Sequence, residues 1–221
     1  DDMRIIDGLQ AGTTVEIDAT NDNFVCSAVN ELCSFPPGRN CREAGGTLGG
    51  EKECLSSTLH LPMVGTGALS GFNRVINLPI SCEIHSGPRN PGDPVQSFDT
   101  DMFRLFGQTI GDPDFDLLRI VAGTDFGMPS PGHTTLTRQP DGNWAVDSFF
   151  DITYRIDFVG APGGPLSGRS GSTTATIRIA TCPGQDVKWL QPPDKTRNGI
   201  DIRVDRHDQI PRIIADDFLC T

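Results

Sequence analysis

Lysine and glutamate are scarce in this sequence. It has 3 lysines beside 15 arginines and 6 glutamates beside 23 aspartates. Long side chains that favour helices are therefore few, whereas aspartate, glycine (25 residues) and proline (17 residues), which form turns, are abundant. This composition excludes a helix bundle.

Clustered positive charge and long apolar runs are also missing. The chain has 221 residues, of which 18 are basic and 29 acidic, giving a formal charge of −11. We therefore expect no nucleic-acid partner, because nucleic-acid binding needs clustered cations. No apolar run reaches about 18 residues, so we also expect no membrane span. A chain of this length can form one hydrophobic core without a metal.

The seven cysteines lack the spacing of a metal site. None belongs to a Cys-x-x-Cys pair, and none has a histidine at zinc-finger distance. We therefore expect a disulfide-bonded protein from an oxidising compartment. The candidates for disulfides are Cys26, Cys33, Cys41, Cys54, Cys82 and Cys182.

The sequence alone does not determine how these cysteines pair. Short-range pairing among the first four is plausible, with a longer bridge from Cys82 to Cys182. Because seven is odd, one cysteine is left over. We predict that it is Cys220, either unpaired or joined to another chain.

Alternation of apolar and polar residues is the dominant local pattern. It is clear at residues 14–18, 152–158, 174–180 and 200–204, and weaker at 58–64, 72–80, 95–106, 117–122, 133–138 and 144–150. The predicted inward faces of two of these segments are Ile152, Tyr154, Ile156 and Phe158, and Ala175, Ile177 and Ile179. Period two with a polar outer face is typical of antiparallel sheets. About nine to eleven short strands predict an all-β antiparallel β-sandwich, immunoglobulin-like or jelly-roll-like.

Turn and linker sequences divide the chain. Residues 140–143 (PDGN) predict a hairpin loop, and the glycine- and proline-rich residues 160–165 separate two strong strands. Three parts are expected: residues 1–54, an N-terminal strand and Cys-rich loop region; 55–183, the β-sandwich core; and 184–221, a linker and C-terminal strand arm.

Turn aspartates are the candidates for a metal. Asp112 opens a sequence like a calcium loop, but Leu117 stands where glycine is needed and Gly123 where glutamate is needed. A looser calcium site, using Asp99 and Asp101 or residues 20–23, is the alternative to solvated carboxylates. The histidines are scattered without zinc-site spacing: His60, His85, His133 and His207. We expect no resident cofactor.

No catalytic motif is complete. Residues 167–171 (SGRSG) approach the Gly-x-Ser-x-Gly nucleophile elbow but fall in a glycine-rich connection between strands. Asp99 with Asp101, or Asp147 with Asp151, imitates a glycosidase pair, yet such carboxylates are ordinary in a chain with 23 aspartates. We predict that the protein is not an enzyme.

Apolar strands at both ends of the sequence are its most informative feature. Each can fold back onto its own sheet or add to the open sheet edge of a neighbouring subunit. The predicted assembly residues of the C-terminal arm are Ile210, Ile213, Ile214, Phe218 and Leu219. The rival N-terminal arm has Met3, Ile5 and Ile6.

Several motifs resemble a family of secreted β-rich surface proteins of environmental bacteria. They are PVQSFDTDM (94–102), GHTT (132–135), VDSFFDI (146–152), KWLQPPD (188–194), GIDI (199–202) and ADDFLCT (215–221). The resemblance covers roughly residues 94–152 and 188–221. It implies export, a surface location and a structural or adhesive role, and it brings no catalytic residues.

The sequence thus favours an extracellular structural protein. We expect the subunit of a pilus-like surface filament or surface layer, in which copies of the chain exchange a terminal β-strand head to tail. The alternative is a monomeric adhesive or carbohydrate-binding surface module that binds glycans and holds calcium in Asp-rich loops.

Overall fold

The computed structural model describes residues 3–27, 30, 32–33, 41–140, 142 and 144–181. This part of the chain is all-β, as predicted, with eleven strands, two short 3₁₀ helices and no α-helix. The first strands are β1 (Met3–Ile5), β2 (Val15–Ile17), β3 (Thr20–Cys26), β4 (Arg42–Ala44), β5 (Glu51–Gly65) and β6 (Asn73–Ser86). The others are β7 (Val95–Ile110), β8 (Phe115–Ala122), β9 (Pro131–Arg138), β10 (Trp144–Gly160) and β11 (Ser170–Ala180). The 3₁₀ helices are η1 (Gly67–Leu69) and η2 (Thr124–Phe126). No helix in the described part is long and apolar enough to cross a membrane.

The described strands form one antiparallel sheet. Its order is β1-β2-β5-β6-β7-β8-β10-β11, with β3 and β4 also paired to β5 and β9 paired to both β7 and β10. Its pairs include strands that are not consecutive in the sequence: β2 and β3 with β5, β7 with β9, and β8 with β10. The predicted all-β antiparallel fold is confirmed.

Two positions in the sheet are filled by strands placed end to end. β2, β3 and β4 follow one another along β5, opposite residues 63–65, 55–60 and 51–53. β8 and β9 share the position between β7 and β10, with η2 in the interruption between them. These interruptions explain why the eleven described strands occupy only eight positions across the sheet.

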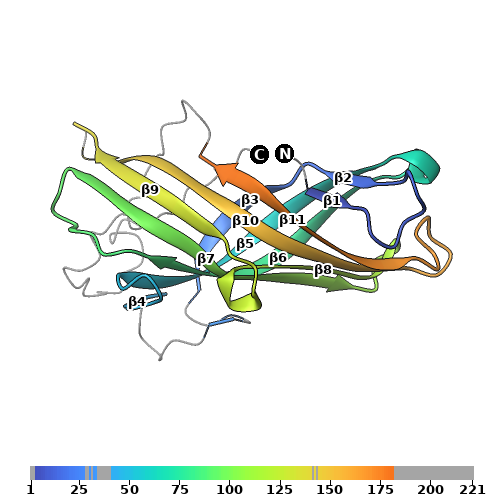
Figure 1. Ribbon diagram of the computed structural model, residues 1–221, viewed down its shortest axis with the longest axis horizontal. Coiled ribbons are helices and arrows are strands. Elements are labelled where there is room, and N and C mark those ends of the chain that lie inside the picture. The colour runs from blue at the N-terminus through green and yellow to red at the C-terminus, as the bar shows by residue number, and fades with distance from the viewer. Residues whose placement is uncertain are drawn as a thin grey trace, which may run out of the picture.

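The sheet folds over on itself into two layers around one core. In Figure 1, β10 and β11 (yellow to orange) cross in front of β5 and β6. A single cluster of buried apolar side chains takes in residues from Met3 in β1 to Ile177 in β11. The predicted boundary at residue 54 lies inside β5, and strands on both sides of it contribute to this core.

Most predicted strand segments are confirmed. The predicted inner face of residues 152–158 is buried, and the predicted hairpin joins β9 to β10 with Trp144 opposite Arg138. Segments 144–150 and 152–158 form the single strand β10. Ile177 is buried and Ile179 half-buried, but Ala175 is exposed, contrary to its predicted inward burial. Residues 200–204 lie outside the described part.

The disulfides confirm part of the predicted pairing. Cys33 and Cys54 are joined, with Cα atoms 6.2 Å apart, and Cys41 is also disulfide-bonded. Cys82 is a free thiol, so the predicted bridge from Cys82 to Cys182 is wrong. The physical reason is its position: Cys82 is 1% exposed in the core in the middle of β6, and this burial raises the pKa of its thiol to about 12. Cys182 lies outside the described residues.

Candidate functional site

The edge strands β1 and β11 meet along a line that we call the seam. The backbone N–H groups of Ile6 and Asp7 both donate to the hydroxyl of Thr173 at 3.0 Å. The N–H of Arg4 donates to the hydroxyl of Tyr154 in β10 at 3.1 Å. Among the described residues no backbone ladder joins β1 to β11. Side-chain hydroxyls therefore satisfy N–H groups that a neighbouring strand would otherwise bind.

One end of the seam is closed by direct backbone contact. A Cβ atom added to Gly8 would lie 2.0 Å from the carbonyl oxygen of Ser170, and one added to Gly171 would lie 1.9 Å from that of Asp7. Both distances are far below van der Waals contact. Only glycine allows these two backbone segments to approach this closely.

The other end of the seam lacks a described strand. One edge of β11 faces away from β10. Thr173 is the last residue of β11 that bonds to the N-terminal segment along this edge. No described strand pairs with residues 174–180 on the same edge. β3 continues the line of β2 along β5, and it too has no described partner on its second side. We call the stretch between β3 and residues 174–180 the open seam.

Side chains at the open seam leave the core incompletely covered. Ala175 lies on the same face of β11 as the buried Thr173 and Ile177, yet it is exposed. Phe24 of β3 and Ile179 of β11 pack against the core but are only partly buried.

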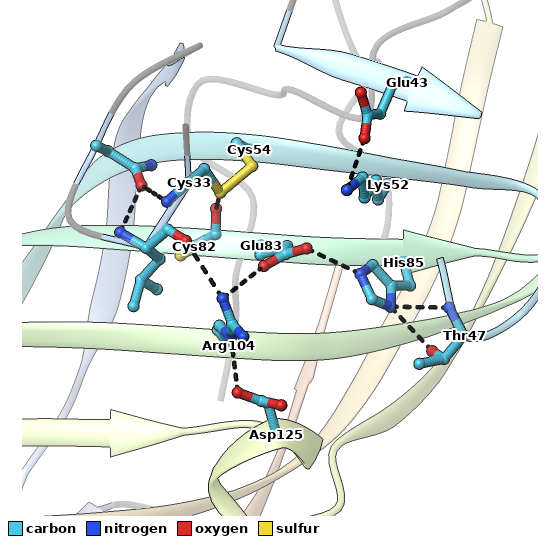
Figure 2. Close-up of polar contacts among 12 residues, drawn as sticks. Cys33, Glu43, Thr47, Lys52, Cys54, Cys82, Glu83, His85, Arg104 and Asp125 are labelled. Atoms are coloured by element: carbon cyan, nitrogen blue, oxygen red, sulfur yellow. Dashed lines mark hydrogen bonds and ion pairs between the residues drawn. A yellow bond between two sulfur atoms is a disulfide. The ribbon is translucent and has the colours of Figure 1, made fainter. Parts of the chain in front are cut away.

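A polar cluster on the outer face joins β6 to β7 (Figure 2). Arg104 Nη1 lies 3.4 Å from Glu83 Oε2, and Arg104 Nε lies 2.8 Å from Asp125 Oδ2 in η2. Glu83 is only 8% exposed. Its negative charge is therefore compensated inside the protein by Arg104.

His85 extends this cluster. Its Nε2 lies 3.1 Å from Glu83 Oε1, and its Nδ1 accepts the backbone N–H of Thr47 at 3.1 Å. A backbone amide can only donate, so Nδ1 is unprotonated and Nε2 donates its proton to Glu83. The ring also stacks on Phe103 with centroids 4.1 Å apart. These contacts hold the segment after β4 against β6.

The Cys33–Cys54 disulfide lies beside the same cluster. Arg104 Nη1 donates to the carbonyl oxygen of Leu32 at 3.3 Å, and Lys52 pairs with Glu43 of β4 at 2.6 Å (Figure 2). The described residues contain no group of three or more His, Cys, Asp or Glu side chains that could hold a metal. We interpret the cluster as a structural one that holds the cysteine-rich region against β6 and β7.

A second polar group has the hydrogen-bond order of a hydrolytic triad. Ser97 Oγ lies 2.8 Å from His133 Nε2, and His133 Nδ1 lies 2.9 Å from Asp99 Oδ1. No sequence motif indicated this group. Ser97 and Asp99 share one face of a predicted strand, but the pairing that places His133 opposite Asp99 has no local sequence signal.

His60 forms a third polar group on the outer face. Its Nε2 lies 2.7 Å from Asp22 Oδ1 in β3, and its Nδ1 lies 2.8 Å from Asn77 Oδ1 in β6. The hydrogen bond to Asp22 is the main cause that raises the pKa of His60, with a smaller contribution from Asn77. Both ring nitrogens can donate when the ring is protonated.

The aspartates considered for calcium bind other groups. Asp112 and Asp114 both pair with Arg74, at 2.5 and 3.1 Å. Asp101 accepts the hydroxyl of Thr124 at 2.7 Å. Asp99 and Asp22 face His133 and His60, as described above.

The residues considered for catalysis are not assembled in the predicted way. Asp151 is paired with Arg178 at 2.6 Å, and Asp147 is exposed on β10. Ser167 lies in the turn between β10 and β11, where its hydroxyl accepts the N–H of Gly163 at 3.2 Å. The motif at residues 167–171 is therefore part of a turn, as the sequence indicated.

The N-terminal candidate for strand exchange lies in the protein's own core. β1 pairs with β2, and Met3 and Ile5 are 4% and 1% exposed, whereas Ile6 is 47% exposed. The C-terminal candidates lie outside the described residues: Ile210, Ile213, Ile214, Phe218, Leu219 and the leftover Cys220.

No family model, curated protein or solved structure matches this chain.

Proposed function

We propose that this chain is an extracellular structural protein, the subunit of a surface filament or layer in which each copy adds a terminal β-strand to its neighbour. The acceptor is the open seam, and the donor is the C-terminal arm with Ile210, Ile213, Ile214, Phe218 and Leu219. The open seam carries the proposal, because two strand edges without a partner among the described strands lie there beside partly buried core side chains. Such an edge presents N–H and C=O groups to an added strand.

The arm is long enough to reach another copy. From Thr181 to Ile210 the chain has 29 further residues (210 − 181), which span up to about 95 Å when extended. Each apolar arm side chain buried in the acceptor contributes about 1.5–3 kcal/mol. The donor and acceptor are different surfaces, so the contact does not close on itself and favours a filament.

Disulfide chemistry supports the extracellular location. The Cys33–Cys54 disulfide and the disulfide-bonded Cys41 are typical of oxidising compartments. The rival function, a glycan-binding module with calcium loops, has less support. The carboxylates of Asp112 and Asp114 are engaged by Arg74.

Negative-stain electron microscopy of the full chain tests this proposal, together with a deletion of residues 205–221. We expect filaments from the full chain and dispersed particles from the deletion. Filaments that form equally well without residues 205–221 would refute the C-terminal arm as donor.

A matched pair of lysine substitutions tests the acceptor. Ala175→Lys places a charge on the inner face of the open seam, where an added strand would bury it. Thr176→Lys places the same charge on the outer face of β11, where it stays in water. We expect Ala175→Lys alone to block assembly, and equal behaviour of the two variants would contradict the proposed acceptor.

A further inference from the structure

We propose that Ser97, His133 and Asp99 form a nucleophilic site, at which Ser97 accepts an acyl group from an activated carboxylic ester. The site lies on the outer face of β7 and β9. The pairing of β7 with β9 brings its residues together: Asp99 lies opposite His133, and Ser97 lies opposite Thr135. The inference is independent of strand exchange, because it uses none of the seam residues.

The three side chains are connected in the order that general-base catalysis needs. The distance from Ser97 Oγ to His133 Nε2 is 2.8 Å, within the range for direct proton transfer. The distance from His133 Nδ1 to Asp99 Oδ1 is 2.9 Å. Asp99 thereby fixes the tautomer in which Nδ1 carries the proton and Nε2 is free to accept one.

The nucleophile is accessible. Ser97 lies on an exposed part of β7, and the side chains of His133 and Asp99 are 38% and 80% exposed. A second hydroxyl, Thr135 Oγ1, lies 3.3 Å from Ser97 Oγ. Either hydroxyl can donate in this contact, so Thr135 is able to offer a hydrogen bond near the carbon that Ser97 would attack.

The reaction consumes only the ester and water. Ser97 Oγ forms a bond to the ester carbonyl carbon while His133 Nε2 takes the hydroxyl proton. The bond from that carbon to the leaving oxygen then breaks, and the leaving oxygen receives the proton from His133. In the second step His133 Nε2 takes a proton from water while the water oxygen bonds to the acyl carbon. The bond from that carbon to Ser97 Oγ then breaks, Oγ receives the proton from His133, and a carboxylic acid leaves.

The surroundings of the site determine the substrate class. The backbone N–H groups of paired strands lie in the plane of the sheet, perpendicular to the side chains. They are therefore not aimed at a developing oxyanion above the face. Asp99 is also well solvated, which weakens its effect on the imidazole. Such a site suits esters with good leaving groups, such as aryl esters.

Two probes test this site on the intact chain: hydrolysis of 4-nitrophenyl acetate, and labelling by a fluorophosphonate with the adduct located by mass spectrometry. We expect the label on Ser97. Ser97→Ala removes it, and His133→Gln lowers the labelling rate roughly a hundredfold. Because these residues lie on the exposed face, we expect the variants to keep the thermal stability of the parent.

Two comparisons separate a nucleophilic site from a merely reactive surface. Ser172 is an exposed strand serine that donates to Asp157 at 2.6 Å. None of the described histidines bonds to it, so it is the matched control and should stay unlabelled. Asp99→Ala should slow labelling of Ser97, and Asp99→Glu should restore it, since Asp99 acts by positioning His133. The proposal is overturned if the adduct is absent, sits on His133, or forms equally on Ser172.

Discussion

The hydroxyl of Tyr154 accepts the backbone N–H of Arg4 at 3.1 Å, joining β10 to β1 across 150 residues of sequence. Tyr154 is 1% exposed, and this burial raises the pKa of its hydroxyl. A raised pKa in the folded state means that the neutral hydroxyl is favoured by folding. Its contribution to stability is fully present below the unfolded value of about 10 and is lost as the pH rises through the folded pKa.

Replacing Tyr154 by phenylalanine should loosen the seam. The substitution keeps the ring but leaves the N–H of Arg4 without its acceptor, which costs about 1–2 kcal/mol in the free energy of unfolding. Urea denaturation measures this loss, and Thr176→Val, which removes an exposed hydroxyl, is the control. The variant should also lose less stability than the parent between neutral pH and pH 11. Equal stability of Tyr154→Phe and the parent would contradict this role of the hydroxyl.

Removing the Cys33–Cys54 disulfide should lower the melting temperature markedly. The two cysteines are 21 residues apart, so the double substitution to alanine is expected to cost about 3 kcal/mol. Differential scanning calorimetry of the double variant gives the value, and an unchanged melting temperature would show that the disulfide does not stabilise the fold.

The thiol of Cys82 should resist alkylation in the native chain. It is buried, and the burial raises its pKa to about 12, so the reactive thiolate is scarce at pH 8. Iodoacetamide followed by mass spectrometry should label Cys82 only after denaturation. Rapid labelling of the native protein would contradict its place in the core.

Truncating Arg104 should destabilise the protein more than truncating Arg178. Arg104→Ala leaves Glu83, which is 8% exposed, without its cation and should cost about 1–3 kcal/mol. Arg178→Ala breaks a pair with Asp151 whose arginine side chain is 60% exposed, which typically costs less than about 1 kcal/mol. Chemical denaturation of the two variants measures the difference, and a larger loss for Arg178→Ala would reverse our ranking.

The hydrogen bond from Asp22 should control the titration of His60. The raised pKa of His60 means that its contribution to stability is fully present below the unfolded value of about 6.5 and is lost as the pH rises through the folded pKa. Asp22→Asn should lower the pKa of His60 in an NMR titration, whereas Asp147→Asn on another strand should leave it unchanged. An unaltered titration in Asp22→Asn would exclude Asp22 as the cause.

The sequence predicted most strands because one face of the sheet packs on the core. Alternation at Ile152, Tyr154, Ile156 and Phe158 follows directly from that geometry. It is absent near Cys54 because Glu53, Cys54 and Leu55 are buried in succession, with both faces of the sheet covered there. Such double coverage hides a strand from periodicity.

The polar groups of the outer face could not be predicted from the sequence, for a different reason. Each joins residues from paired strands, as His133 joins Asp99 and His60 joins Asp22. Which strands pair, and in what register, depends on the packing of the whole sheet. The free state of Cys82 likewise follows from its burial in the core and not from cysteine spacing.

Amide hydrogen exchange at residues 174–180 tests strand exchange most directly. We predict that amides on the edge of β11 facing away from β10 are protected in assembled protein and exchange rapidly in dilute dispersed protein or after deletion of residues 205–221. Equal protection of these amides in the assembled protein, in the dilute dispersed protein and in the variant without residues 205–221 would contradict an added strand from a neighbouring copy.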